Sequence, residues 1–90
     1  MPEALDELVG CEVVLDTAGP MVYLGRLASY DNEGFNLENA DVHSRIEGHA
    51  PRDQYIAESR QHGIRPNRAR VYVFRYAVIS ISALSDVRED

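Results

Sequence analysis

The sequence predicts a mainly β domain: a small, strongly bent, five-stranded antiparallel barrel with a short N-terminal helix and a helical insertion between strands 3 and 4. Three observations support this prediction. Short runs rich in Val, Ile, Tyr and Phe are separated by turn residues, and one of these runs carries a glycine in its middle. The chain is also only long enough for one small core. We therefore expect residues 1–90 to form a single domain.

The first half of the chain contains a predicted helix and two predicted strands. Residues 2–9 have a proline in the first turn and early acidic residues, both of which favour the start of a helix. Residues 11–16 alternate as a strand does, and residues 21–30 form a longer strand interrupted by Gly25. Glycine weakens strand pairing unless the strand bends or another backbone comes close, so we expect the sheet to curl there. A turn at residues 31–34 ends the strand.

Three further strands are predicted in the rest of the chain. Residues 35–42 run back from the turn as the third strand. Residues 43–70 are long for a connection, and within them residues 51–62 have the proline start and glycine stop of a helix. Residues 70–76 and 77–84 supply the fourth and fifth strands, with almost no loop between them.

Charge is distributed unevenly along the chain. Residues 1–42 carry a net charge of −8, residues 43–70 carry +3 and residues 71–90 carry −1. Every cation is an arginine, whose planar guanidinium suits bidentate contact with phosphate or carboxylate and stacking on rings. The overall acidity argues against tight nonspecific binding of nucleic acid, because phosphate neutralisation supplies most of that affinity.

The sequence disfavours several classes of protein. No apolar run reaches the roughly 20 residues of a membrane helix, and the first residues lack the basic and apolar regions of a signal peptide. Cys11 is the single cysteine, which excludes an internal disulfide and a Cys-based zinc site, so we expect a cytoplasmic protein. There is no nucleophile elbow, catalytic Cys–His pattern or glycine-rich phosphate loop. We therefore expect no catalysis and no cofactor.

One pair of residues has the spacing of metal ligands. Glu58 and His62 are four residues apart, so they share a face of the predicted helix. Surface histidines in polar segments are far commoner than zinc sites, and we expect no metal here.

The motifs of the two halves, taken in order, form a known pattern. After the helix, the first half contains, in order, Gly10, Val13, Val14, Leu15, Gly19, Gly25, Leu27, Tyr30, Asp31, Phe35, Asn36 and Leu37. This order resembles the first Sm motif of Sm and Sm-like (LSm) proteins, over residues 10–42. Val71 to Arg75, followed by Ile79 and Ile81, resembles the second and shorter motif, over residues 71–84. Residues 43–70 are then a variable insertion.

The resemblance implies a ring. Sm-like subunits join through their fourth and fifth strands, usually as hexamers or heptamers, and here those strands are residues 70–76 and 77–84. A Val-, Ile- and Phe-rich strand without lysine or proline is poorly protected as an exposed edge, and a ring would cover it. The alternative is a monomer in which both strands are internal.

The resemblance also implies a site for single-stranded RNA on one face of the ring, near the pore. By the resemblance, Asn36 is expected to hydrogen-bond a base edge, usually of uracil, Arg75 to cover the base and Asp31 to hold the loop. Stacking of unpaired bases, repeated in every subunit, would supply the affinity. We expect U- or A-rich RNA. The candidate RNA-binding residues are Asp31, Asn32, Phe35, Asn36, Arg75 and Tyr76.

The chain departs from the family pattern in two places. Three residues, not two, separate Asp31 from the hydrophobic-Asn pair, and Gly34 stands where the family often places a stacking ring or a histidine. The Arg-Gly of the second motif is here Arg75 and Tyr76, although a tyrosine can itself offer a stacking face. These departures leave open a second function: a protein-interaction or scaffold subunit with the Sm fold that does not bind RNA.

Structural roles also remain open for the candidate residues. Asp31 and Asn32 are common turn residues that satisfy local backbone groups. Phe35 is most simply a core residue, and Arg75 could pair with Asp31 to lock two loops together. Residues 43–70 are either an arm that contacts RNA or a protein partner, or a solvated insertion whose arginines offset the acidic barrel; the weak apolar pattern favours the solvated insertion.

Overall fold

The computed structural model describes residues 4–44 and 52–88. In chain order the elements are η1 (Ala4–Leu8), β1 (Glu12–Thr17), β2 (Met21–Tyr30), β3 (Gly34–Ser44), α1 (Arg52–His62), β4 (Arg68–Phe74), η2 (Arg75–Ala77), β5 (Val78–Ala83) and η3 (Leu84–Asp86). The five predicted strands are confirmed, and their ends lie within two residues of the expected positions. Across the two described ranges, no helix has the length and apolar character that crossing a membrane requires.

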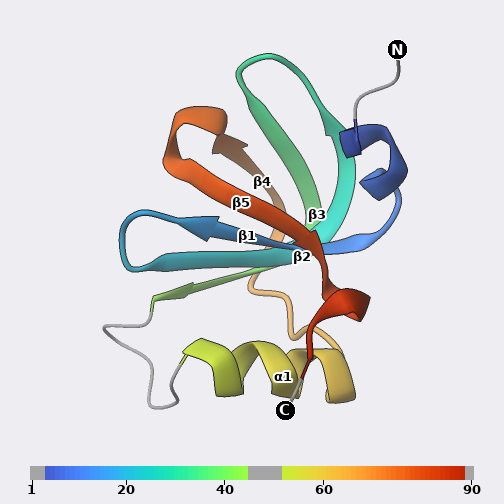
Figure 1. Cartoon of the computed structure of the whole chain (residues 1–90), viewed down its shortest axis with the longest axis vertical. Coiled ribbons are helices and arrows are strands. Elements are labelled where there is room, and N and C mark those ends of the chain that lie inside the picture. The colour runs from blue at the N-terminus through green and yellow to red at the C-terminus, as the bar shows by residue number, and fades with distance from the viewer. Residues whose placement is uncertain (1–3, 45–51, 89–90) are drawn as a thin grey trace.

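The strands form one antiparallel sheet in the order β4-β3-β2-β1-β5 (Figure 1). Its two edges, β4 and β5, do not pair with each other within the described chain, so the five antiparallel strands are confirmed as an open sheet and do not close the predicted barrel. The three-residue 3-10 turn η2 nevertheless carries the chain from one edge to the other. So short a connection is possible because the sheet bends strongly enough to bring its edges near each other.

At Gly25, β2 and β3 come close to each other. A Cβ atom on this residue would lie 3.1 Å from both the Cα and the Cβ of Ala40, so the missing side chain permits the approach, as predicted. Opposite Gly25 the register between the two strands shifts, and Asn39 of β3 adopts a left-handed conformation with φ 49°. Asparagine is one of the few residues besides glycine that adopts this conformation readily. This bulge was not predicted from the sequence.

The inner face of the sheet carries the main core. Its buried residues are Val13, Leu15, Leu27, Phe35, Leu37, Ala40 and Val73. Leu5 and Leu8 of η1 pack against this core, and the Tyr30 hydroxyl donates a hydrogen bond to the Asp6 carboxylate. The predicted N-terminal helix is therefore a single short 3-10 helix that depends on packing; residues 2 and 3 of the predicted range lie outside the described residues.

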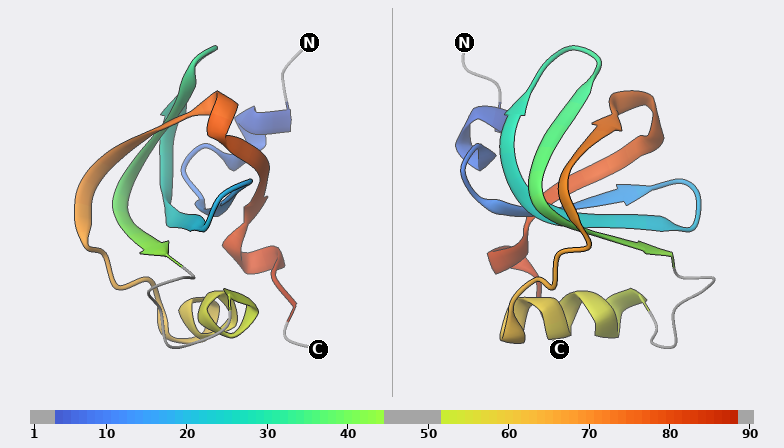
Figure 2. Two further views of the ribbon diagram at one scale, coloured as in Figure 1. Left: turned by 90° about the vertical axis from the view of Figure 1, so that its left-hand side faces the viewer. Right: turned by 180° about the vertical axis from the view of Figure 1, so that it is seen from behind.

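Helix α1 covers the outer face of the sheet, at the end of the molecule opposite the β2–β3 hairpin (Figures 1 and 2). A second buried cluster forms there from Val14, Val22, Leu24, Ile56 and Leu84. Val14 thus points to the outer side of β1, as strand alternation predicts, but it is buried. The expectation that residues 43–70 form a solvated insertion is wrong for one side of α1, because Ile56 is buried against Val14, Val22 and Leu24 of the sheet; residues 45–51 of that segment lie outside the described residues.

Polar contacts also hold α1 in place. The Tyr55 ring stacks on His43 of β3, with ring centroids 3.8 Å apart and planes 12° from parallel. Its hydroxyl donates a hydrogen bond to the Asp41 carboxylate. Burial, followed by this contact with Asp41, raises the pKa of Tyr55 far above its usual range, so the phenol stays neutral and keeps donating.

We predict that Ile56→Ala destabilises the fold by about 2–4 kcal/mol, because it removes a buried side chain from the outer cluster and leaves a cavity. Urea denaturation followed by circular dichroism measures the loss. The matched control is Gln54→Ala, an exposed position on the same helix, which should change the free energy of unfolding by less than about 0.5 kcal/mol. Equal stability of the two variants would show that α1 does not stabilise the sheet.

Candidate functional site

The β2–β3 turn is organised by the carboxylate of Asp31. Its Oδ1 atom accepts hydrogen bonds from the backbone N–H groups of Glu33 and Gly34, at 2.8 and 2.9 Å. The Tyr72 hydroxyl on β4 donates a third bond to the same atom, at 2.7 Å. The bond from Tyr72, followed by the backbone bond from Glu33, lowers the pKa of Asp31, and the same contact raises the pKa of Tyr72 to about 12. Asp31 therefore holds its own turn and also ties that turn to β4.

Arg75 ties the β4–β5 connection to the same turn. Its backbone N–H donates to the Glu33 carbonyl at 2.7 Å, and its Nη2 donates to the backbone carbonyl of Asp31 at 3.1 Å. The guanidinium lies over the ring of Phe35, with Cζ 5.5 Å from the ring centroid. Arg75 and Asp31 thus join the two loops. The Arg75 side chain bonds the backbone carbonyl of Asp31, whereas the Asp31 carboxylate is bonded by Tyr72. The buried Arg75 Nε makes no hydrogen bond within the described residues.

Gly34 leaves room for the ring of Tyr72. A Cβ atom at Gly34 would lie 2.5 Å from the Val73 carbonyl oxygen and 2.7 Å from Tyr72 Cζ. The position that the family pattern gives to a stacking ring is therefore empty, but β4 places a tyrosine ring directly beside it. Tyr72 was not among the predicted site residues. The available signal was strand alternation, which puts Tyr72 on the opposite side of β4 from the core residue Val73.

Asn36 points to the outer side of β3, whereas its neighbour Phe35 points to the core. Its Nδ2 donates to the Ser29 hydroxyl at 3.0 Å. Asn36 lines a groove of about 440 Å³ together with Ala28, Leu37, Glu38, Arg70, Val71 and Tyr72. Within the described chain, the contacts of Asn36 and those of Arg75 are separate. The structure therefore does not place these two predicted base-contacting residues against each other.

The other predicted residues fall in different environments. Phe35 is only 4% exposed, so it is a core residue that supports Arg75 and is not an accessible ring. Asn32 is exposed at the tip of the turn. Tyr76 is 88% exposed, and its ring stacks on that of Phe74, with centroids 5.7 Å apart. Of the predicted rings, Tyr76 alone is open to a ligand.

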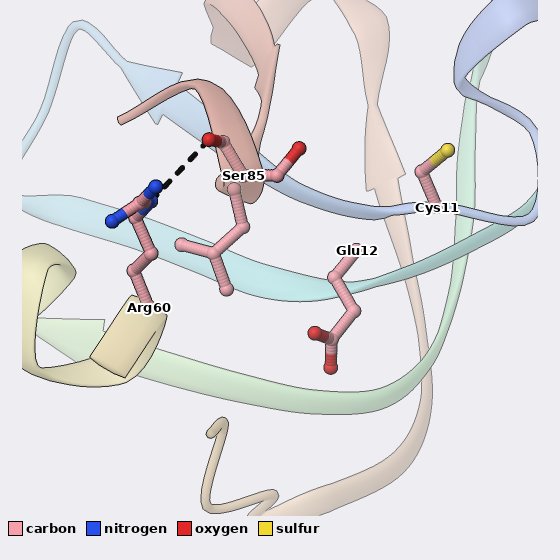
Figure 3. Close-up of a pocket in the computed structure, with 5 residues that line it drawn as sticks. Cys11, Glu12, Arg60 and Ser85 are labelled. Atoms are coloured by element: carbon pink, nitrogen blue, oxygen red, sulfur yellow. Dashed lines mark hydrogen bonds between the residues drawn. The ribbon is translucent and has the colours of Figure 1, made fainter. Parts of the chain in front are cut away.

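A second hollow, of about 410 Å³, is built from other elements (Figure 3). The residues lining it are Cys11, Glu12, Arg60, Leu84 and Ser85. Arg60 of α1 donates from Nε to the Ser85 carbonyl at 3.3 Å, so the hollow marks where α1 is tied to η3. No cluster of three or more His, Cys, Asp or Glu side chains suited to a metal ion occurs among the residues that the structure describes.

Comparison with solved structures shows which fold this is. The chain is similar to the Sm protein of Pyrococcus abyssii, whose structure was solved in complex with a uridine heptamer. The TM-score is 0.61 at 16% sequence identity, over 91% of this chain and 99% of that chain. The chain has an Sm-like fold. The resemblance seen in the two sequence motifs is thereby confirmed at the level of the fold. No protein-family model matches this sequence, and no curated protein shows a significant match.

We predict that Gly34→Ala destabilises this Sm-like domain by about 1–3 kcal/mol, because the new methyl group collides with the Val73 carbonyl and displaces the Tyr72 ring. Thermal or urea denaturation measures the effect. Gly19→Ala is the matched control, since a Cβ atom at Gly19 meets nothing within 4 Å. If Gly34→Ala proved as stable as Gly19→Ala, the close packing of β4 on the turn would be contradicted.

The pKa of Asp31 predicts a pH dependence of stability. Because the folded-state pKa lies below the ordinary value of 3.8, the contacts of the ionised carboxylate stabilise the fold above that value. This stabilisation is lost as the pH falls through the folded-state pKa. Wild type should therefore lose more stability than Asp31→Asn between about pH 6 and about pH 2, and Tyr72→Phe should fall between the two. Denaturation midpoints measured across this pH range give the loss of stability of each variant. Parallel plots of midpoint against pH for wild type and Asp31→Asn would show that the Asp31 carboxylate does not stabilise the fold.

Proposed function

We propose that this chain is a ring-forming Sm-like protein that binds short single-stranded RNA on the surface made by the β2–β3 turn and the β4–β5 connection. The observation that carries this proposal is the joining of these two loops. Tyr72 donates to the Asp31 carboxylate and Arg75 donates to the Asp31 carbonyl, so that the two loops are already joined without a ligand. Loops that are ordered before binding lose little conformational entropy on binding.

The surface offers the three kinds of contact that single-stranded RNA uses. The exposed ring of Tyr76 can stack a base, which is worth about 1–3 kcal/mol for each base. The Asn36 amide can donate to and accept from a base edge. The Arg75 guanidinium, already bonded to one loop carbonyl, can use its remaining donors on a base or a phosphate. Because the protein is acidic overall, stacking and edge contacts should supply more of the affinity than phosphate neutralisation does.

The two sheet edges support assembly into a ring. Both β4 and β5 end the sheet, so each presents unpaired backbone groups, and Ile79 of β5 is 69% exposed. Pairing of β4 in one copy with β5 in the next satisfies both edges, and a head-to-tail contact of this kind closes into a ring when the rotation allows. The proposed assembly is a homo-oligomer, a hexamer or a heptamer. Each copy would add one RNA site, which raises the overall affinity.

The solved neighbour supports the choice of ligand. The Pyrococcus Sm protein was solved with a uridine heptamer, so U-rich RNA is the first ligand to test, with A-rich RNA beside it. We also propose that the protein acts in the cytoplasm, without a cofactor and without catalysis of its own.

A second candidate function is a protein-interaction or scaffold subunit that does not bind RNA. One observation favours this second function. The ring of Tyr72 fills the space beside Gly34 and is held there by the bond from its hydroxyl to Asp31, so less space is left for a base. In that case the exposed side of α1, within residues 43–70, is the surface for a protein partner.

We predict that labelled oligo-U or oligo-A binds the wild-type protein saturably, with an affinity that weakens at higher salt. Arg75→Ala should weaken binding by about 5- to 150-fold, which corresponds to the 1–3 kcal/mol of one base contact. Fluorescence anisotropy at two salt concentrations measures this. The matched control is Arg88→Ala, which removes the same charge from an exposed arginine outside the site and should bind as wild type does.

The same samples decide between the two candidate functions and test the ring. Absence of binding by wild type, even at low salt, would overturn the RNA proposal and favour the scaffold. Native mass spectrometry should show a hexamer or a heptamer. A monomer at micromolar concentration would contradict the ring.

A further inference from the structure

The outer face of β4 carries a row of side chains that continues from the proposed site, and two of its members, Arg70 and Phe74, have no part in that site. Arg70, Tyr72 and Phe74 alternate along the strand with Val71 and Val73, which pack against the inner core. Strand geometry therefore places the first three on one outward face, about 6.8 Å apart. We call Arg70, Tyr72, Phe74 and the adjoining Tyr76 the outer row.

The aromatic members of the outer row touch one another, and Phe74 and Tyr76 are open to solvent. Tyr72 meets Phe74 edge to face, with centroids 5.3 Å apart, and Phe74 stacks on Tyr76 with their planes 23° from parallel. Phe74 is 50% exposed and Tyr76 is 88% exposed. A contiguous exposed aromatic patch on a small domain marks a binding surface. Flat rings in sequence along a strand are suited to successive nucleobases.

The groove beside Asn36 and Tyr72 is bordered by one acidic and one basic side chain, Glu38 and Arg70. The carboxylate of Glu38 forms an ion pair with Arg26 across β2 and β3. Arg70 lies opposite Glu38 on β4, and its guanidinium makes no ion pair or hydrogen bond within the described residues. The groove of about 440 Å³ is thus bordered by a free guanidinium, the Tyr72 ring and the Asn36 amide. A cation, a ring and an amide together match a nucleotide: its phosphate, the face of its base and the edge of its base.

We propose that single-stranded RNA bound at the loop surface continues along the outer row, with a base against Asn36 and Tyr72 in the groove and a phosphate on Arg70. The next bases stack on Phe74 and Tyr76. This inference rests on the proposed function and adds a path for the RNA beyond the two loops. The path is compatible with a ring, because strand pairing at β4 uses the backbone edge and leaves its outward side chains free.

The test compares three variants of the full chain in binding to labelled oligo-U and oligo-A. Phe74→Leu keeps an apolar side chain but removes the flat ring, and it should weaken binding at least about fivefold. Arg70→Gln should lower the slope of log affinity against log salt by about 0.7 for each phosphate that is no longer neutralised. Arg88→Gln makes the same chemical change at an exposed arginine outside the row and should keep the wild-type slope. Circular dichroism and native mass spectrometry establish that each variant keeps its fold and assembly.

A second readout reports contact directly. Ultraviolet irradiation of the complex crosslinks stacked bases to aromatic side chains, and trypsin, which cleaves after Arg70 and after Arg75, releases residues 71–75 as one peptide. RNA attached to this peptide and located on Phe74 by fragmentation supports the path. If wild type binds RNA while both row variants bind equally well and peptide 71–75 carries no RNA, the path is wrong and the loop site stands. If wild type binds neither probe, the proposed function itself is wrong.

Discussion

The close approach of β2 and β3 at Gly25 is the constraint on which the rest of this structure depends. With no side chain at Gly25, Ala40 of β3 packs directly on β2, and the left-handed bulge at Asn39 takes up the change of register. The resulting bend turns a five-stranded sheet back on itself, so that the three residues of η2 can connect its opposite edges. The same bend brings the β2–β3 turn beside the β4–β5 connection. The candidate site exists only because those two loops meet.

A strongly bent sheet also has an outer face that must be covered. β1 and β2 are buried on both sides: Val13 and Leu15 in the inner core, and Val14 and Leu24 beneath α1. In a domain of this size the second cluster is a large share of the buried apolar surface, so α1 is a structural element as well as an insertion. It lies at the end opposite the joined loops (Figure 1). The outer cluster beneath α1 and the proposed binding surface therefore lie at different ends of the molecule, although the contacts of Asp31, Gly34 and Phe35 at the binding end also support the fold.

Local patterns predicted the parts of this structure that depend on neighbouring residues. Strand alternation, the turn that starts at Asp31 and the interruption at Gly25 all follow from residues a few positions apart, and all are observed. The contacts that were missed join distant segments. Tyr72 reaches Asp31 across 41 positions, and Ile56 meets strands that no local periodicity connects to it. Phe35 was assigned both to the core and to the RNA site, and only the three-dimensional packing shows that it is covered.

The contact between Asp31 and Tyr72 also shapes what the site can distinguish. Because the hydroxyl is bonded to Asp31, Tyr72 offers a ligand the face of its ring, and not a free polar edge. In the proposed RNA path, the exposed rings of Phe74 and Tyr76 would likewise stack on any flat base, since stacking is tolerant of sequence. Base identity would then be read mainly by the Asn36 amide, which carries a donor and an acceptor and can satisfy the edges of both uracil and adenine. A surface with several rings that stack bases and one amide that bonds base edges would bind unpaired RNA of many sequences, with a modest preference for particular bases. Discrimination among sequences would have to come from the geometry of the ring, which sets how many such sites one strand can reach at once.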